Sequence, residues 1–133
     1  MRKGFWKGLR LIEISIIWAL IIVAISIVYV RYDAFMCRSI ESEAKFSLEQ
    51  IYAAQMLYHK EHDHFASMET LVNKEQRVLI PQKYYVFSDK FPPQQDHFCI
   101  QAFGRKKTLV SGQIWQIDEA QELLNIESRC GYE

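Results

Sequence analysis

The chain lacks the features that would direct it to an enzymatic or a nucleic-acid-binding function. It has no excess of either charge, because its 16 lysines and arginines equal its 16 aspartates and glutamates. Proteins that neutralise nucleic-acid phosphates by bulk charge need a basic excess. The sequence also holds no glycine-rich phosphate loop, no nucleophile elbow and no Cys-x-x-Cys pair. We therefore expect no catalytic residue, no cofactor and no nucleic-acid partner.

Glycine and proline are missing from a long N-terminal stretch. The chain holds 5 glycines and 3 prolines, but neither occurs between Leu9 and Asp63. These two residues are the ones that most strongly interrupt a helix. We therefore expect one continuous helix of about 53 residues, roughly 80 Å long, that ends near His62.

Charged side chains are missing from residues 14–30, which are almost entirely apolar. A helix of this length covers roughly 26 Å, and Leu11 and Ile12 bring the apolar stretch close to the ~30 Å thickness of bilayer hydrocarbon. A cleaved secretory signal would have a shorter apolar core and a small-residue cleavage site, which the sequence after Tyr29 does not offer. The stretch therefore predicts a membrane-spanning helix. Basic residues without acids precede it, so we expect the N-terminus to face the cytoplasm and the rest of the chain the outside.

Glu13 places a carboxylate inside the apolar part of this helix. A charge at the centre of a membrane helix costs roughly 2.5–3.5 kcal/mol on insertion scales, which indicates a functional role and a partner. Alternatively, Glu13 marks the start of the helix in the headgroup zone, where this cost fades.

The region before the apolar stretch resembles the processing site of type IV pilins and of type II secretion pseudopilins. That family has a short basic leader, a glycine at the cleavage point, a hydrophobic first mature residue and a glutamate four residues later. These elements are matched by Lys7-Gly8-Leu9-Arg10-Leu11-Ile12-Glu13. The resemblance implies that a prepilin peptidase cleaves after Gly8 and that Leu9 is then N-methylated.

The resemblance also implies a role for Glu13 in assembly. Cleavage would create a positive amino terminus on Leu9, and in a packed filament Glu13 would lie against the amino terminus of a neighbouring subunit. A buried ion pair that loses one partner leaves a costly charge, so the pair would set the axial register of the subunits. We therefore expect Glu13 to be a subunit–subunit contact. Arg10 and the lack of glycine and proline in the apolar half depart from the common pattern, and they favour a minor pilin or a pseudopilin over a shaft subunit.

Helical periodicity continues beyond the apolar stretch and gives the second half of the helix one apolar face. Charged residues occupy the opposite face. A stripe at steps of three or four residues predicts a helix that packs on a globular head, although an isolated coiled coil would show the same pattern. The stripe consists of Cys37, Ile40, Ala44, Leu48, Ile51, Ala54 and Tyr58.

The remaining sequence predicts a small antiparallel sheet. Ser67 is expected to cap a short helix over residues 68–74. The connections between the strands are short, which implies an antiparallel meander, with Trp115 and Ile117 facing the helix. The expected strands are residues 84–87, 97–103, 108–117 and 122–127.

The chain has 3 cysteines, an odd number. A disulfide persists in an exported head, because that compartment is oxidising. We expect Cys99 and Cys130 to pair, because Cys130 lies beyond the last strand and because the family often closes its C-terminal region with such a bridge. Cys37 is expected to be a small buried apolar side chain, but sequence alone leaves a Cys37 pairing open.

Two polar clusters have ordinary explanations. The group His59, His62, Asp63 and His64 contains residue types that bind zinc, but a solvated helix end gathers the same residues, and we adopt that interpretation. Residues 105–107 are the compact basic cluster outside the leader, and a charged hairpin turn explains them better than contact with DNA.

Taken with the resemblance, the sequence predicts an α+β fold in which a long helix packs on an antiparallel sheet of three or four strands, as in pilins. The expected function is a filament subunit held in the inner membrane with its head in the periplasm. A prepilin peptidase, other pilin or pseudopilin subunits, the inner-membrane assembly machinery and the lipid bilayer are its expected partners. The alternative is a bitopic membrane-anchored binding module that never polymerises. The expected parts are a cleaved leader (1–8), a membrane or filament-core half-helix (9–30), an amphipathic half-helix (31–62) and a globular head (63–133).

Overall fold

The computed structural model describes residues 2–75 and 77–128, apart from the side chains of residues 2–7 and 9. Internal contacts divide the chain into two units, Met1–Phe35 and Met36–Glu133. Along the described residues the element order is one long helix, one short π-helical segment and four strands.

Helix α1 spans Arg2–His62 without interruption, which confirms the expected continuous helix. The helix ends because Asp63 takes the left-handed conformation, with φ of 58°. The Asp63 N–H still donates to the His59 carbonyl at 2.8 Å, so the last turn is closed before the chain changes direction. Aspartate tolerates this conformation better than most residues, and it therefore serves as a helix stop in place of glycine.

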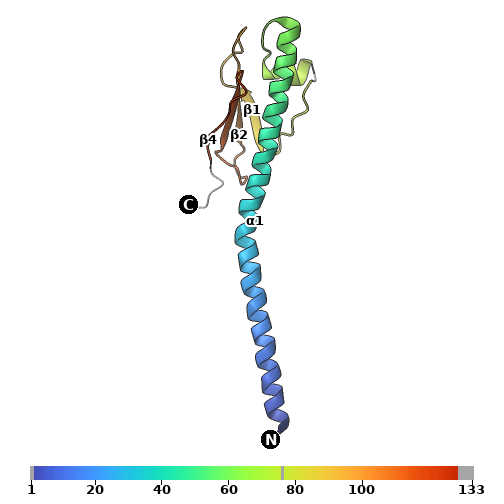
Figure 1. Cartoon of the computed structure of the whole chain (residues 1–133), viewed down its shortest axis with the longest axis vertical. Coiled ribbons are helices and arrows are strands. Elements are labelled where there is room, and N and C mark those ends of the chain that lie inside the picture. Colours follow the sequence, from blue (N-terminus) through green and yellow to red (C-terminus); the bar gives the residue numbers. More distant parts are fainter. Residues whose placement is uncertain (1, 76, 129–133) are drawn as a thin grey trace. The chain divides into compact units, whose positions relative to one another are not determined.

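Four strands form an antiparallel meander in the order β1-β2-β3-β4, as expected. Figure 1 shows the strands beside the second half of α1. Strands β2 and β3 lie in the middle, and β1 and β4 are the edges of the sheet. Phe87 pairs with Ala102, and Ala102 pairs with Trp115, so these three side chains lie on the same face. The strand bounds are Tyr85–Asp89 for β1, Cys99–Gly104 for β2, Ile114–Asp118 for β3 and Leu123–Glu127 for β4.

The strand expected over residues 108–117 is shorter than predicted, because its first part is a turn. The Ser111 N–H donates to the Thr108 carbonyl at 3.1 Å, and Gly112 has φ of 81°. The turn brings Val110 into the core, where none of its side chain is exposed. The regular strand therefore begins at Ile114, after this turn.

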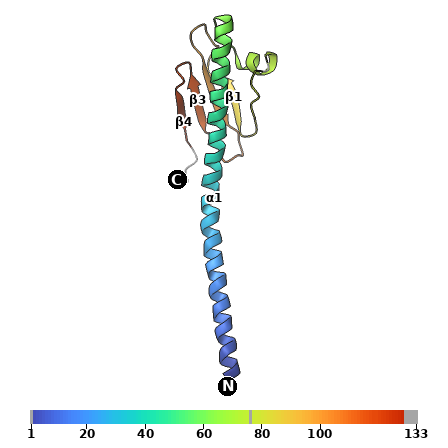
Figure 2. The same ribbon diagram turned by 45° about the vertical axis from the view of Figure 1, so that its right-hand side comes forward.

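The core of the head lies between the sheet and the second half of α1. Figure 2 shows α1 crossing the face of the sheet, with β3 and β4 on one side and β1 on the other. The apolar stripe predicted on α1 is confirmed, since Leu48 and Ile51 are completely buried and the rest of the stripe packs with them. Trp115 and Ile117 face the helix as expected. This burial supplies the main favourable free energy of the head.

A buried glutamine joins α1 to the segment that follows it. The Gln55 amide donates to the Ala66 carbonyl at 2.5 Å, and its oxygen accepts the Ala66 N–H at 2.9 Å. Immediately afterwards, Ser67 Oγ accepts the Thr70 N–H at 3.2 Å, which confirms the expected cap. The capped helical turn continues as the π-helical segment η1, Thr70–Lys74, and positions the extended chain that leads to β1.

Candidate functional site

The residues around Glu13 form the first candidate site. Glu13 is exposed on α1 between Ile12 and Ile14, which are 58% and 51% exposed. Gly8 lies earlier on the same helix, and a Cβ added to it would meet nothing within 4 Å. The side chain of Leu9, the expected methylation site, lies outside the described residues.

The surface that surrounds Glu13 is apolar and uncovered. Large apolar side chains from Leu11 to Val30 are between 41% and 72% exposed. Among the described residues, α1 is the helix that is long and apolar enough to cross a membrane, and none of its most apolar window is buried. So large an exposed apolar surface marks a site of interaction with lipid or protein. A carboxylate on such a surface is costly to cover with lipid or protein unless a cation meets it.

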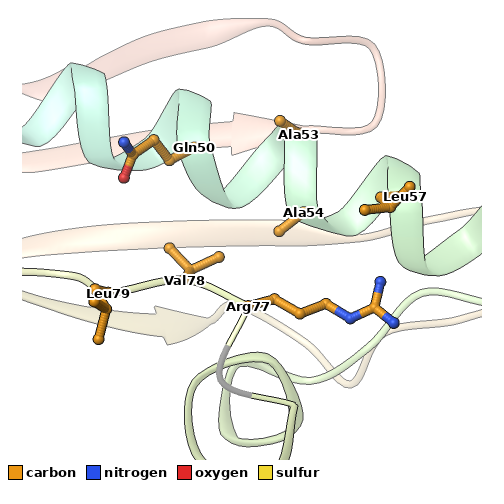
Figure 3. Close-up of a pocket in the computed structure, with 7 residues that line it drawn as sticks. All are labelled: Gln50, Ala53, Ala54, Leu57, Arg77, Val78 and Leu79. Carbon is orange, nitrogen blue, oxygen red and sulfur yellow. The ribbon is translucent and has the colours of Figure 1, made fainter.

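A second candidate site is a groove of about 560 Å³ on the head, between α1 and the extended segment after η1 (Figure 3). Leu79 on its rim is 90% exposed and Leu57 is 53% exposed, whereas Val78 is buried. The sequence carried no clear signal for this groove, because residues 66–96 show no regular periodicity. Its lining consists of Gln50, Ala53, Ala54, Leu57, Arg77, Val78 and Leu79.

Arg77 lies at the Leu57 end of the groove (Figure 3). Its guanidinium donates to Glu61 Oε2 at 2.5 Å and to Glu75 Oε2 at 3.3 Å, and it lies 5.6 Å from the centre of the Tyr58 ring. The hydrogen bond from Arg77 lowers the pKa of Glu61. Because these carboxylates are exposed to solvent, the pairs position Arg77 more than they stabilise the fold. The guanidinium is therefore engaged in the head's own contacts.

The face of the sheet that points away from α1 carries an apolar row. Val86 pairs with Phe103, and Phe103 pairs with Ile114. Val86 and Phe103 are 39% and 36% exposed, and Ile126 on β4 is 48% exposed. On the same face Gln101 pairs with Gln116, and the Gln116 amide oxygen accepts hydrogen bonds from the side chains of Gln101 and Lys90. The head thus exposes apolar surface on its outer face as well as in the groove.

The histidines at the end of α1 interact with neighbouring groups. His59 Nε2 lies 3.0 Å from the Gln95 carbonyl oxygen, and His64 Nδ1 lies 2.8 Å from the His62 carbonyl oxygen. The His62 ring stacks on Tyr58, with ring centres 4.1 Å apart. In the described part of the chain, no group of three potential ligands is placed to hold a metal ion.

The basic run at residues 105–107 lies in the turn that follows β2. The Arg105 N–H donates to the Tyr84 carbonyl at 2.8 Å, and Lys107 has φ of 65°. These contacts anchor the start of the turn on the segment before β1. The cluster is therefore a charged turn, as the sequence predicted.

The cysteines differ from the prediction. Cys99 is a free, buried thiol, so the expected bridge between Cys99 and Cys130 is wrong. Burial raises the pKa of the Cys99 thiol, which keeps it protonated and unreactive. Cys37 is disulfide-bonded, although the sequence favoured an unpaired side chain at this position. Cys130 lies outside the described residues.

The register of the sheet explains why Cys99 does not pair with the C-terminal cysteine. Cys99 pairs with Asp118 at one end of β3, whereas Glu127 at the end of β4 pairs with Ile114 at the other end. A strand of this length covers roughly 15 Å, and a disulfide needs Cα atoms within about 7 Å. The chain therefore leaves β4 at the end of the sheet opposite to Cys99. Sequence spacing holds no signal for this, because strand register decides it.

Comparison with known proteins identifies the fold. No protein-family profile matches the sequence, and no curated protein matches it. A solved structure is similar: the non-core minor pilin PilV of Neisseria meningitidis, with a TM-score of 0.55 and 16% identity over 71% of this chain and 91% of that chain. At this identity the likeness concerns the fold. With its long apolar helix packed on a four-stranded antiparallel sheet, the chain has the α+β fold of type IV pilins, as its sequence predicted.

Proposed function

We propose that the chain is a structural subunit of a type IV pilus-like filament, assembled by packing its apolar helix against those of other subunits. One observation carries the proposal. The helix that packs on the pilin-like head begins with an apolar stretch, and its large apolar side chains from Leu11 to Val30 are 41% to 72% exposed. In a filament subunit this apolar surface is covered at both stages of the subunit's life. Lipid covers it while the subunit is stored in the inner membrane, and neighbouring helices cover it after assembly.

Processing belongs to the same proposal. A prepilin peptidase cleaves after Gly8, Leu9 is N-methylated, and Glu13 pairs with the amino terminus of a neighbouring subunit. The surroundings of Gly8 support this role, because a Cβ at this position would meet nothing within 4 Å. A glycine in a helix interior costs about 1 kcal/mol relative to alanine. Since packing within the chain does not require Gly8, recognition by an enzyme is the better reason for a glycine there.

The proposal also sets the topology. The leader lies in the cytoplasm, the head lies in the periplasm, and inner-membrane machinery moves the processed subunit into the pilus or pseudopilus. The basic residues that precede the apolar stretch without an accompanying acid support this orientation.

Replacing Gly8 tests the proposal. In a bacterium that has a prepilin peptidase, we expect the wild-type chain to begin at methylated Leu9 and Gly8→Ala to retain Met1. The reason is steric: a peptidase site that fits glycine at the cleavage point has no room for the methyl group of alanine. Mass analysis of the intact purified chain measures both outcomes. Gly4→Ala is the matched control, because it makes the same change in the leader without touching the cleavage point, and it should be processed normally.

The same measurement distinguishes the alternative function. A wild-type chain that still begins at Met1 in such a bacterium contradicts the filament proposal. It would instead support a bitopic protein that stays anchored in the membrane and uses its head as a binding module.

A further inference from the structure

The disulfide partner of Cys37 follows from the other cysteines of the chain. Cys37 is disulfide-bonded and buried on α1, at the start of the unit that forms the head. The chain has 3 cysteines, and Cys99 is a free thiol. Within one chain this leaves Cys130 as the remaining candidate.

The contacts of Cys37 place it at one end of the sheet. Its Sγ lies 3.7 Å from the Leu109 carbonyl oxygen and 3.8 Å from the Gln113 side-chain nitrogen. The same Gln113 nitrogen donates to Glu41, one turn further along α1, at 2.8 Å. Gln113 immediately precedes β3, so Cys37 lies beside the start of that strand.

Strand β4 runs toward this same end. Its last residue, Glu127, pairs with Ile114, the first residue of β3 and the neighbour of Gln113. Cys130 follows Glu127 by three residues in the sequence. Three residues span at most about 10 Å, which is enough to reach a helix that packs directly on the sheet. The direction of β4 and the reach of the three residues after Glu127 are therefore both compatible with a bond from Cys130 to Cys37.

We propose that Cys37 and Cys130 form a disulfide that fastens the C-terminal edge of the sheet to α1. In this step the two thiols lose two protons and two electrons, and an S–S bond forms. A protein disulfide of the exporting compartment accepts the electrons and is reduced to its dithiol. The inference rests on the export of the head in the proposed function, but not on polymerisation.

The weak packing of β4 gives the bond its role. Four of the five β4 residues are exposed, and Leu123 alone is partly buried against the core. As an edge strand, β4 is bonded to β3 along one side only. Ladder hydrogen bonds with so little burial hold a strand weakly, and a strand that detaches leaves the edge of β3 open to pairing with other chains. A covalent tie at the end of β4 prevents this detachment.

Peptide mapping tests the connectivity. The full chain is exported in cells, extracted in detergent and digested without reductant. We expect a linked pair of peptides that contain Cys37 and Cys130, lighter by two hydrogens than their sum, and a Cys99 that takes an alkylating label only after unfolding. A link to Cys99, or a dimer linked through Cys37 on a non-reducing gel, would overturn the proposal. A chain that begins at Leu9 but has a reduced Cys130 would refute the proposed disulfide and leave the proposed function intact.

Variants test the role of the bond. Cys37→Ser and Cys130→Ser should each lower the Tm of the head by about 10 °C or more, and the double variant should lose no more than the larger single loss. Cys99→Ser is the control, because it should keep the linked peptides. In Cys130→Ser the amides of Leu123–Glu127 should exchange with solvent faster than those of β2, and unchanged exchange would refute the tie. Should this variant not fold, mild reduction of the wild-type chain provides the same exchange measurement.

Discussion

Asp89 is a half-buried carboxylate at the end of β1 that supports the segment after α1. Its Oδ2 accepts the Met68 N–H at 3.0 Å. Burial raises the pKa of Asp89, and the hydrogen bond from Met68 offsets part of this effect. The folded state therefore binds the Asp89 proton more tightly than the unfolded state does. The resulting stability is fully present below the unfolded pKa, and it is lost as the pH rises through the folded pKa.

Asp89→Asn is expected to stabilise the head at neutral pH, because asparagine keeps an acceptor for the Met68 N–H without carrying a charge. The gain should be at most about 1 kcal/mol, since solvent screens a half-exposed group, and it should vanish as the pH falls below the unfolded pKa of about 3.9. Urea unfolding at several pH values measures it. Asp89→Ala is the comparison variant, and it should be less stable than Asp89→Asn because it leaves the Met68 N–H without an acceptor.

Gly104 shows how the elements of the head constrain one another. It ends β2, and its N–H donates to the Gln113 carbonyl at 2.9 Å across the turn that leads to β3. A Cβ on Gly104 would lie 1.7 Å from the Val110 carbonyl oxygen, which belongs to the backbone. The turn that buries Val110 therefore passes too close to β2 for any side chain.

Gly104→Ala should destabilise the head by roughly 1–3 kcal/mol, because the turn has to move away and draws Val110 out of its place in the core. Thermal or urea unfolding, followed by circular dichroism, measures the loss. In unprocessed chains, produced without a prepilin peptidase, Gly8→Ala is the matched control, since a Cβ at Gly8 meets nothing within 4 Å. Equal stability of Gly104→Ala and the wild-type chain would show that the turn does not pack as described.

For the molecule as a whole, the proposed pairing between subunits depends on a charge that α1 carries on an apolar surface. Glu13 is exposed among apolar neighbours, and no side chain in the most apolar window of α1 is buried within the chain. In a filament core that carboxylate has to meet a cation, because an unpaired charge in apolar surroundings is costly.

Glu13→Gln should reduce incorporation into filaments at least about tenfold, since the loss of an ion pair in a buried site is worth more than 1.4 kcal/mol. Processing after Gly8 should continue. Immunoblots of sheared filaments against total cell protein measure incorporation. Glu49→Gln is the control, because Glu49 is an exposed carboxylate on the part of α1 that belongs to the head. Normal incorporation of the Glu13 variant would contradict the proposed pairing.

The amino-acid sequence by itself determined the long helix, its apolar first half and the buried stripe that begins at Cys37. These features depend on local properties: residues that do not break a helix, the absence of charge, and a helical period that the chain carries whatever it packs against. The order of the strands was also predictable, because short connections permit little besides an antiparallel meander. The residues around Gly8 also form a local, linear pattern, and the cleavage that this pattern predicts stays a prediction.

Only the tertiary structure decided the groove lined by Leu57 and Leu79, the turn at Val110 and the state of the cysteines. Each of these depends on residues far apart in the sequence that meet through packing or strand register. Cys99 and Cys37 show this most clearly, because the sequence favoured Cys99 as the bridged residue. The register of β2, β3 and β4 places the last residue of β4 at the end of the sheet that lies beside Cys37, whereas Cys99 lies at the opposite end. No local pattern encodes that register.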